Sequence, residues 1–280
     1  MRAGAPLGWR AVGGSVAGLL HVRDERGCDD AHGWRLADGQ AIVAVADGAG
    51  SRPGTSALGA HVAVEAVLGV TGDAGFRRRF ADHPAPAVAA LFEAALAAVE
   101  TAAASLGVDP GLLATTLCVA VIGETDVVVG QIGDGIAAVE RPDGAAQAVA
   151  VADRFEYANE TVFLTTPQAL TDHLKVHHVP AEDVRGLALT TDGLRYKVLD
   201  DVTGGVLYQQ FYADTWQWAR GGEAASAAIE GFLASVDDQT GDDKTLVVLV
   251  RGFDGEVAEP VRLSPRPEVT YGIGTGATHD

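Results

Sequence analysis

Apolar runs that meet an aspartate beside glycine or a second aspartate constrain this chain more than any other feature of its sequence. There are four of them: VAVADGAGS with Asp47, VVVGQIGDG with Asp134, LALTTDGL with Asp192, and GDDKTLVVLV, which begins with Asp242 and Asp243. A single Asp–Gly pair predicts no more than a turn. If these apolar runs are strands of shared sheets, however, their ends bring several carboxylates to one edge.

Clustered carboxylates repel one another, and a divalent cation is the natural compensation. Oxygen ligands suit Mg²⁺ or Mn²⁺, and a neighbouring glycine lets backbone carbonyls, water and substrate approach closely. A fifth acidic pair, Asp29 and Asp30, precedes the first predicted hairpin. From the pattern alone two interpretations stay open, a metal site and a sheet edge that merely carries acidic turns.

The charge balance excludes several classes of partner. The chain of 280 residues has 38 acidic and 20 basic side chains, a net charge of −18. Nucleic acids and anionic lipids are bound mainly through Lys and Arg, so we expect neither as a partner. Phosphate esters would also be repelled unless bound cations reversed the local charge.

The cysteines and apolar runs indicate the compartment. Cys28 and Cys118 form no CxxC pair, which argues against a disulfide scaffold and fits a reducing cytoplasm. No run reaches the ~18 apolar residues of a membrane span. The N-terminal apolar run is broken by glycines and by Trp9–Arg10, so it does not resemble a signal peptide. We expect a cytoplasmic protein.

Hydrophobic periodicity predicts a layered α+β domain. Residues 31–47 form a predicted hairpin with its turn at Asp38–Gly39, and apolar residues at helical spacing cover 57–70, 86–107 and 226–236. Further strands are predicted at 9–22, 114–123, 126–135, 136–144, 160–166, 184–193 and 244–252. Strands and helices come in blocks, which favours α+β over βαβ alternation. Residues 253–280 lack apolar periodicity and predict a flexible C-terminal extension.

In this order and spacing, DGAGS, GQIGDG, LTTDGL and GDDKTLVVLV resemble the motifs of the metal-dependent PP2C-type serine/threonine protein phosphatases. The N-terminal GLLHVRDERGCDDAHG is similar to the SHxxxGxxCQDA of a bacterial branch of that family. The resemblance covers about residues 12–252, so residues 1–252 are the predicted phosphatase domain. It implies a four-layer αββα sandwich of two antiparallel sheets flanked by helices, with two Mn²⁺ or Mg²⁺ ions at one end and a third, more loosely bound ion.

The resemblance also implies a role for each matched residue. Asp47 resembles the carboxylate that bridges both ions, Gly48 the glycine that offers its carbonyl, and Asp30 an acidic residue that acts partly through water. The implied metal-binding set is Asp30, Asp47, Gly48, Asp134, Asp192, Asp242 and Asp243, where Asp192 and Asp242 bind the other ion and Asp134 joins Asp192 at the third. Asp30, Asp47, Asp192 and Asp242 are the implied catalytic residues.

Three departures from the family pattern bear on mechanism. Ala49 stands where a histidine often follows the bridging Asp-Gly, so protonation of the leaving group would fall to metal-bound water or another group. Gly135–Ile136 replaces the usual Ser-Arg, which predicts a differently supported loop. Among the arginines, Arg23 and Arg26 are the favoured candidates for binding the substrate phosphate, and Arg52 follows the bridging aspartate.

The implied activity is hydrolysis of phosphoserine or phosphothreonine in a protein by water that the two ions activate. Two alternatives stay open: a catalytically weak phosphatase-like module that binds phosphoproteins, and a hydrolase of a small phosphorylated metabolite. We expect a phosphorylated protein as partner and a monomer. His173 and His177 could share a helix face and hold zinc, but no third ligand is evident and Pro180 closes the segment, which favours a surface or flap segment.

Overall fold

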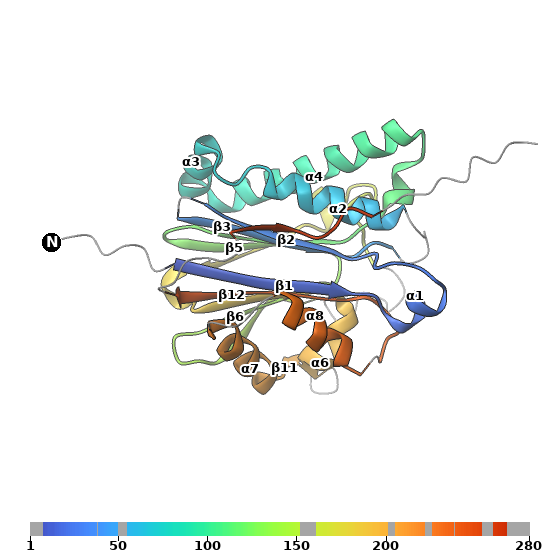
Figure 1. The fold of residues 1–280 in the computed structure, drawn as a ribbon. Coiled ribbons are helices and arrows are strands. Elements are labelled where there is room, and N and C mark those ends of the chain that lie inside the picture. The colour runs from blue at the N-terminus through green and yellow to red at the C-terminus, as the bar shows by residue number, and fades with distance from the viewer. Residues whose placement is uncertain are drawn as a thin grey trace, which may run out of the picture.

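Two antiparallel sheets lie face to face, and helices cover the outer face of each (Figure 1). This computed structural model describes residues 8–37, 39–49, 55–151, 161–200, 205–221, 226–237, 239–253 and 260–267. The predicted four-layer αββα sandwich is confirmed.

The six-stranded sheet has the order β13-β2-β3-β4-β5-β8. Its strands are β2 (Ala31–Ala37), β3 (Gln40–Ala46), β4 (Leu117–Ile122), β5 (Asp126–Ile132), β8 (Lys175–Pro180) and β13 (Val261–Leu263). The predicted hairpin is β2–β3, which pairs antiparallel from Ala31–Ala46 to Ala37–Gln40. The helices α2 (Ser56–Leu68), α3 (Ala74–Asp82) and α4 (Pro84–Leu106) pack on this sheet, and η1 (Pro110–Leu113) leads into β4.

The five-stranded sheet has the order β1-β12-β9-β6-β7. Its strands are β1 (Gly8–Val16), β6 (Ile136–Glu140), β7 (Ala146–Ala150), β9 (Gly186–Thr190) and β12 (Lys244–Phe253). The helices α6 (Arg195–Val198), α7 (Gln209–Arg220) and α8 (Ser226–Ser235) cover its outer face through a core around Trp216 and Tyr212. The remaining elements are α1 (Leu19–Arg23), α5 (Ala169–Asp172), η2 (Ala181–Asp183), η3 (Asp192–Leu194), β10 (Leu199–Asp200) and β11 (Val206–Leu207).

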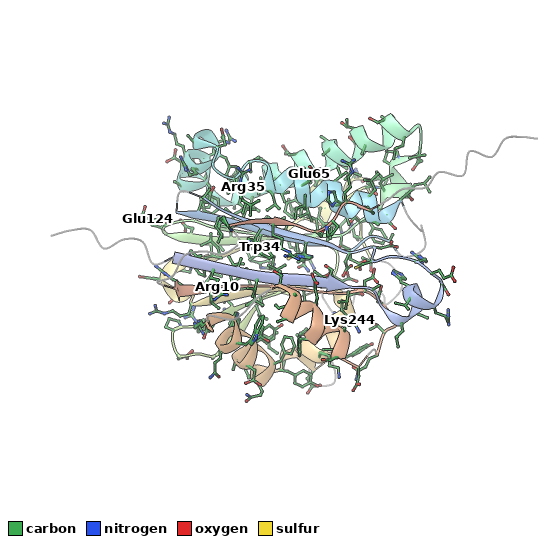
Figure 2. The ribbon with its side chains drawn as sticks, viewed as in Figure 1. Arg10, Trp34, Arg35, Glu65, Glu124 and Lys244 are labelled. Atoms are coloured by element: carbon green, nitrogen blue, oxygen red, sulfur yellow. The ribbon has the colours of Figure 1, made fainter. Side chains whose placement is uncertain are left out.

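The core between the sheets is built by alternate residues of their strands. Trp34 lies there (Figure 2), together with Val43 and Val45 of β3 and Val247 and Leu249 of β12. Successive side chains of a strand point to opposite faces, so the intervening residues of these strands pack against the helices or their neighbours. Both faces are covered, which explains why β3, β4 and β12 are apolar almost throughout.

The long helix α4 is apolar because it is a core helix. By length and composition alone it could cross a membrane. In the structure Val88, Leu91 and Phe92 are buried in the layer over the six-stranded sheet, whereas Glu93 and Glu100 are exposed. The helix ends, as predicted, at Gly107, whose φ of 67° is the left-handed conformation that glycine adopts readily.

Several sequence-based predictions differ from the structure. The predicted strand 9–22 is a strand only as far as Val16 of β1, and Leu19–Arg23 form the helix α1. Of the predicted strand 160–166, residues 161–166 form turns and irregular backbone instead. The alternative that the sequence did not favour, a helix face shared by His173 and His177, is excluded because residues 175–180 form the strand β8, and no metal-binding group of described residues contains the two histidines. Residues 261–263 of the predicted flexible extension pair with β2, and this part belongs to the sandwich. The prediction for residues 254–259 and 268–280 concerns residues outside those that the structure describes.

Candidate metal centre

Asp47 directly follows β3, and its backbone is held by the two threonines that precede β4. Its amide donates to Thr116 Oγ1 at 2.9 Å, while its carbonyl accepts from the amide of Thr116 at 2.8 Å and from Thr115 Oγ1 at 3.0 Å. These contacts use the main chain of Asp47 alone. The carboxylate therefore remains available at the end of the strand.

Gly48 brings the first acidic pair up to this strand end. Its amide donates to the carbonyl of Asp29 at 3.2 Å. A Cβ at this position would lie 2.7 Å from the carbonyl carbon of Ser56 and 2.8 Å from the carbonyl oxygen of Asp29. Only glycine allows the two backbones to approach so closely.

Asp134 and Asp192 join Asp47 in one carboxylate cluster, in which one oxygen of each lies within 4.8 Å of the others. Asp134 follows Gly133 in the β5–β6 turn, and Thr161 Oγ1 donates to it at 2.9 Å. Asp192 follows β9 and begins η3. The three segments are far apart in sequence, and the sandwich brings them to one end. In place of the family's Ser-Arg, the Gln131 side chain donates to the carbonyl of Gly135.

Asp30 lies buried beside the cluster with its two oxygens in different surroundings. Oδ2 accepts from Thr191 Oγ1 at 2.8 Å and from Thr245 Oγ1 at 2.6 Å. Oδ1 is buried and has no hydrogen-bond partner among the described residues, and the same is true of Asp192 Oδ1. A buried carboxylate oxygen without a donor is costly. Two such oxygens at one site indicate that something else contacts them.

The electrostatics of the site point to a cation. Burial raises the pKa of Asp47 well above its usual range, and the charges of Asp30, Asp192, Asp242 and Asp134 raise it further. Burial, followed by Asp134 and Asp242, raises the pKa of Asp192 to about 7, although a hydrogen bond with Asp47 and the charge of Arg195 oppose this. Burial and Asp243 likewise raise the pKa of Asp30. Carboxylates so placed cannot all ionise at neutral pH without a positive charge among them.

The donor set fits hard divalent cations. It consists of carboxylate oxygens, several buried and two without a partner, at the terminus of a rigid sheet sandwich. Mg²⁺ and Mn²⁺ prefer such oxygen ligands. The residues present therefore fit the ions that the resemblance implies.

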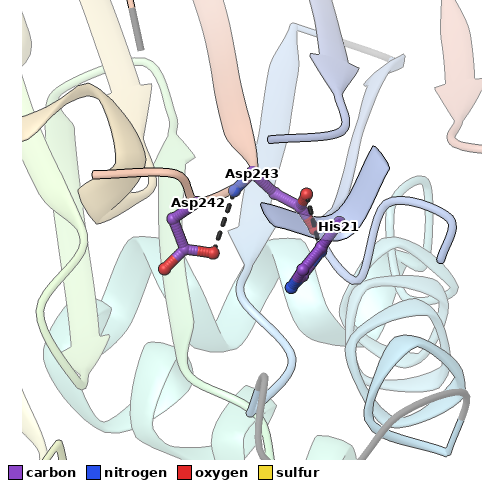
Figure 3. A group of neighbouring side chains, drawn as sticks. All are labelled: His21, Asp242 and Asp243. Carbon is purple, nitrogen blue, oxygen red and sulfur yellow. Dashed lines mark hydrogen bonds and ion pairs between the residues drawn. The ribbon is translucent and has the colours of Figure 1, made fainter. Parts of the chain in front are cut away.

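Asp242 and Asp243 are neighbours in sequence but point in different directions (Figure 3). Asp242 lies near the cluster, and its charge contributes to the raised pKa of both Asp47 and Asp192. Asp243 points away, to His21, whose Nδ1 lies 2.8 Å from Asp243 Oδ1.

Asp243 holds the first motif in place. Its Oδ1 also accepts from the amide of Gly18 at 2.8 Å, and its Oδ2 accepts from the amide of Asp29 at 2.5 Å. We call Gly18, His21, Asp29 and Asp243 the clamp. The clamp gives both oxygens of Asp243 protein partners, and the same carboxylate lies with His21 and Asp242 in a group whose ligand atoms are all within 4.8 Å of one another.

The candidate arginines lie in different places. Arg26 forms an ion pair with Asp29 and its side chain is 19% exposed, whereas that of Arg23 is 71% exposed and pairs with Asp24. Arg195, at the start of α6, was not among the residues singled out from the sequence, yet its charge lowers the pKa of Asp192. In the sequence, its position three residues after Asp192 could have identified Arg195 as a residue of the site. Arg52 lies outside the described residues.

A family model for protein phosphatase 2C matches residues 17–234. This span contains the carboxylate cluster and all the elements from α1 to most of α8, and it ends before Asp242. The chain belongs to the protein phosphatase 2C family, and by that membership it is a PP2C-type serine/threonine phosphatase.

Solved structures share the fold at low sequence identity. The Mycobacterium tuberculosis serine/threonine phosphatase PstP/Ppp is 16% identical, with a TM-score of 0.58 over 86% of this chain and 98% of that one. Stp1 from Staphylococcus aureus is 14% identical, with a TM-score of 0.53 over 89% and 97%. PppA, described as a regulatory component of a secretion system in Pseudomonas aeruginosa, is 16% identical, with a TM-score of 0.53 over 88% and 100%. No curated protein matches the sequence.

Proposed function

We propose that this phosphatase hydrolyses phosphoserine and phosphothreonine in proteins with the help of two Mn²⁺ or Mg²⁺ ions and a third, weaker one. The observation that carries the proposal is the carboxylate cluster. Three distant segments bring Asp47, Asp134 and Asp192 within 4.8 Å of one another, and buried oxygens of Asp30 and Asp192 lack a donor.

The chain's own residues would hold the ions. Asp47 would hold both, the carbonyl of Gly48 would be a further ligand, Asp192 and Asp242 would hold the other ion of the pair, and Asp134 with Asp192 would hold the third. Asp30 would act from beside the cluster. When bound, such ions lower the pKa of water and neutralise charge on the phosphoryl oxygens. Asp243 would support the site through the clamp in addition to the ligand role that the resemblance implies.

The thiols do not offer a competing mechanism. Burial raises the pKa of the Cys118 thiol to about 12, and burial together with the charges of Asp30 and Asp243 raises the pKa of the Cys28 thiol. A cysteine nucleophile needs the opposite shift, because the thiolate is the reactive form. The carboxylate cluster is therefore the only chemistry that we assign to this site among the described residues.

For binding the substrate phosphate, we favour Arg26 over Arg23. Arg26 is largely buried and forms an ion pair with Asp29, the residue before Asp30, while Arg23 is exposed and paired with Asp24. A guanidinium beside the ions would contact phosphoryl oxygens with paired donors. We further propose a phosphorylated protein as substrate, a monomer and a cytoplasmic location, consistent with the acidic composition and the unpaired cysteines.

The test is hydrolysis by the metal-free protein, titrated with Mn²⁺ or Mg²⁺, of phosphoserine peptides, p-nitrophenyl phosphate and small phosphorylated metabolites. We expect turnover that requires the added ion, favours the peptides and is abolished in Asp47→Asn. A preference for metabolites would identify a small-molecule hydrolase. Binding of phosphopeptides without turnover at any ion concentration would identify a regulatory module and would overturn the proposal.

A further inference from the structure

A line of hydrogen bonds leads from Asp30 into the space between the two sheets. Thr245 Oγ1 lies 2.6 Å from Asp30 Oδ2 and 2.7 Å from Ser15 Oγ. Ser15 Oγ in turn lies 2.7 Å from His32 Nδ1. Thr245 and His32 are buried, at 0% and 2% exposed. We call Thr245, Ser15 and His32 the relay.

The relay consists of three polar side chains at the ends of rows that are mostly apolar. Thr245 precedes Val247 and Leu249 on the inner face of β12, and His32 precedes Trp34 on the inner face of β2. Ser15 is paired with Thr245 in the β1–β12 register. In β12 the row is polar at Thr245, which contacts Asp30, and again at Arg251 at its other end. Apolar side chains could fill this space without leaving a hydrogen-bonding group unsatisfied. The presence of three polar side chains here therefore requires an explanation.

The hydrogen bonds can run in only one direction while Asp30 is ionised. A carboxylate only accepts, so Thr245 donates its single hydroxyl proton to Asp30 and can only accept from Ser15. Ser15 therefore donates to Thr245 and accepts from His32. The ring proton that His32 supplies must sit on Nδ1. Donors aligned in this way polarise one another and strengthen the last bond, the one to Asp30.

The relay also determines which oxygen of Asp30 is free. With Thr191 it occupies Oδ2 fully, and Oδ1 is the buried atom without a partner. The carboxylate is thus fixed in orientation and left with one oxygen to bind. We propose that Thr245, Ser15 and His32 are positioning residues that set the affinity of the site for divalent cations through Asp30. This inference rests on the proposed function.

The sharpest test measures Mn²⁺ affinity of the metal-free protein by calorimetry, with no substrate present. Partners that orient a ligand typically change metal affinity by about 10- to 100-fold. We expect Thr245→Val to weaken Mn²⁺ binding by about 100-fold. Thr245→Ser keeps the hydroxyl and should bind Mn²⁺ nearly as tightly as the wild type. Ser15→Ala and His32→Leu do not touch Asp30, and each should weaken binding by about tenfold.

Two further variants separate positioning from a merely structural role. His32→Asn places an amide donor near the position of Nδ1 and should restore most of the affinity that His32→Leu loses. The double variant Ser15→Ala with His32→Leu should bind no more weakly than the weaker single variant, because either change interrupts the same chain. His61→Leu is the control, since His61 is a buried histidine of α2 outside the relay. It should leave Mn²⁺ affinity unchanged.

The outcomes distinguish the two proposals. Urea unfolding of each metal-free variant reports whether it is folded and how stable it is. If wild type binds Mn²⁺ and the folded Ser15→Ala and His32→Leu proteins bind it equally well, the relay is structural and this inference is wrong, while the proposed function stands. If wild type binds no Mn²⁺ at all, both are wrong.

Discussion

The clamp and the carboxylate cluster lie side by side but satisfy their charges in opposite ways. In the clamp, Asp243 accepts from two backbone amides and lies against His21, so both of its oxygens have partners. In the cluster, Asp47, Asp134 and Asp192 face one another, and Asp192 Oδ1 has no donor. The two regions touch through Gly193, where a Cβ would lie 1.9 Å from the carbonyl oxygen of Asp243.

The difference separates two uses of buried aspartate. A carboxylate whose oxygens all meet protein donors stabilises the fold, and removing it leaves those donors unsatisfied. A carboxylate that faces other carboxylates destabilises the fold unless a cation joins it. Substitution in the clamp should therefore cost stability, and substitution in the cluster should cost activity.

The largest expected effect is on activity, from Asp192→Asn. Mutating a residue that hydrogen-bonds to a metal ligand lowers metal affinity or activity by up to ~100-fold. Replacing a ligand itself should have a larger effect, so we expect Mn²⁺-dependent turnover to fall by more than ~100-fold. The measurement is phosphopeptide hydrolysis at saturating Mn²⁺. Asp143→Asn, in the exposed β6–β7 turn, is the matched control and should be fully active. Equal activity of the two variants would place the ions elsewhere.

Next in size is the loss of stability in Asp243→Ala. The change leaves the amides of Gly18 and Asp29 without an acceptor and His21 without its partner. Breaking a buried charged arrangement by removing one member costs about 3–5 kcal/mol. Urea unfolding of the metal-free protein checks this figure. A loss below about 1 kcal/mol would mean that water replaces Asp243 and that the clamp is not structural.

Much of the fold was predictable because its signals are local. The continuous apolar runs of β3, β4, β5 and β12 and the long pattern of α4 identified these elements within a few residues. The helices α1 and α3 were missed. The first has five residues and no side-chain cap, and the second carries three arginines that hide its two buried phenylalanines. β13 depends on pairing with β2, which no local pattern encodes.

The site was predictable in its members but not in their contacts. Motif order identified Asp47, Asp134, Asp192 and Asp242, whose mutual influence the structure shows. The hydrogen bonds that Asp243 accepts from the amides of Gly18 and Asp29 were not predicted, because they join segments 225 and 214 residues apart in sequence. The relay required the register that pairs Ser15 with Thr245, and register between strands 230 residues apart in sequence is a property of the folded sandwich.

A smaller effect should appear in the pH dependence of stability without metal. The pKa of Asp192 is about 7 in the folded chain, above its ordinary value of 3.8, so the folded state holds this proton more tightly than the unfolded state. The resulting stability is fully present below about pH 4 and is lost as the pH rises through about 7.

Asp192→Asn should remove this dependence. In EDTA, the variant and wild type should unfold at similar urea concentrations near pH 4, and the variant should be the more stable of the two at pH 8. Added Mn²⁺ should reverse the order at pH 8 by stabilising wild type only. A variant that is less stable than wild type in EDTA at both pH values would show that Asp192 is satisfied within the protein, as Asp243 is.

The smallest expected effect comes from substituting the arginines of the first motif, and it distinguishes Arg26 from Arg23 as the residue that binds the substrate phosphate. Arg26 is held against Asp29 within the clamp region, and Arg23 is exposed beside Asp24. If Arg26 contacts the substrate phosphate, Arg26→Lys keeps a charge near Asp29 but loses the paired donors. It should raise KM for a phosphopeptide about tenfold, which corresponds to the loss of one hydrogen bond to a charged group. The free energy of unfolding should change little. Arg23→Ala should change neither, because exposed ion pairs contribute little. A raised KM in Arg23→Ala alone would assign the phosphate contact to the surface of α1 and would leave Arg26 as a purely structural partner of Asp29.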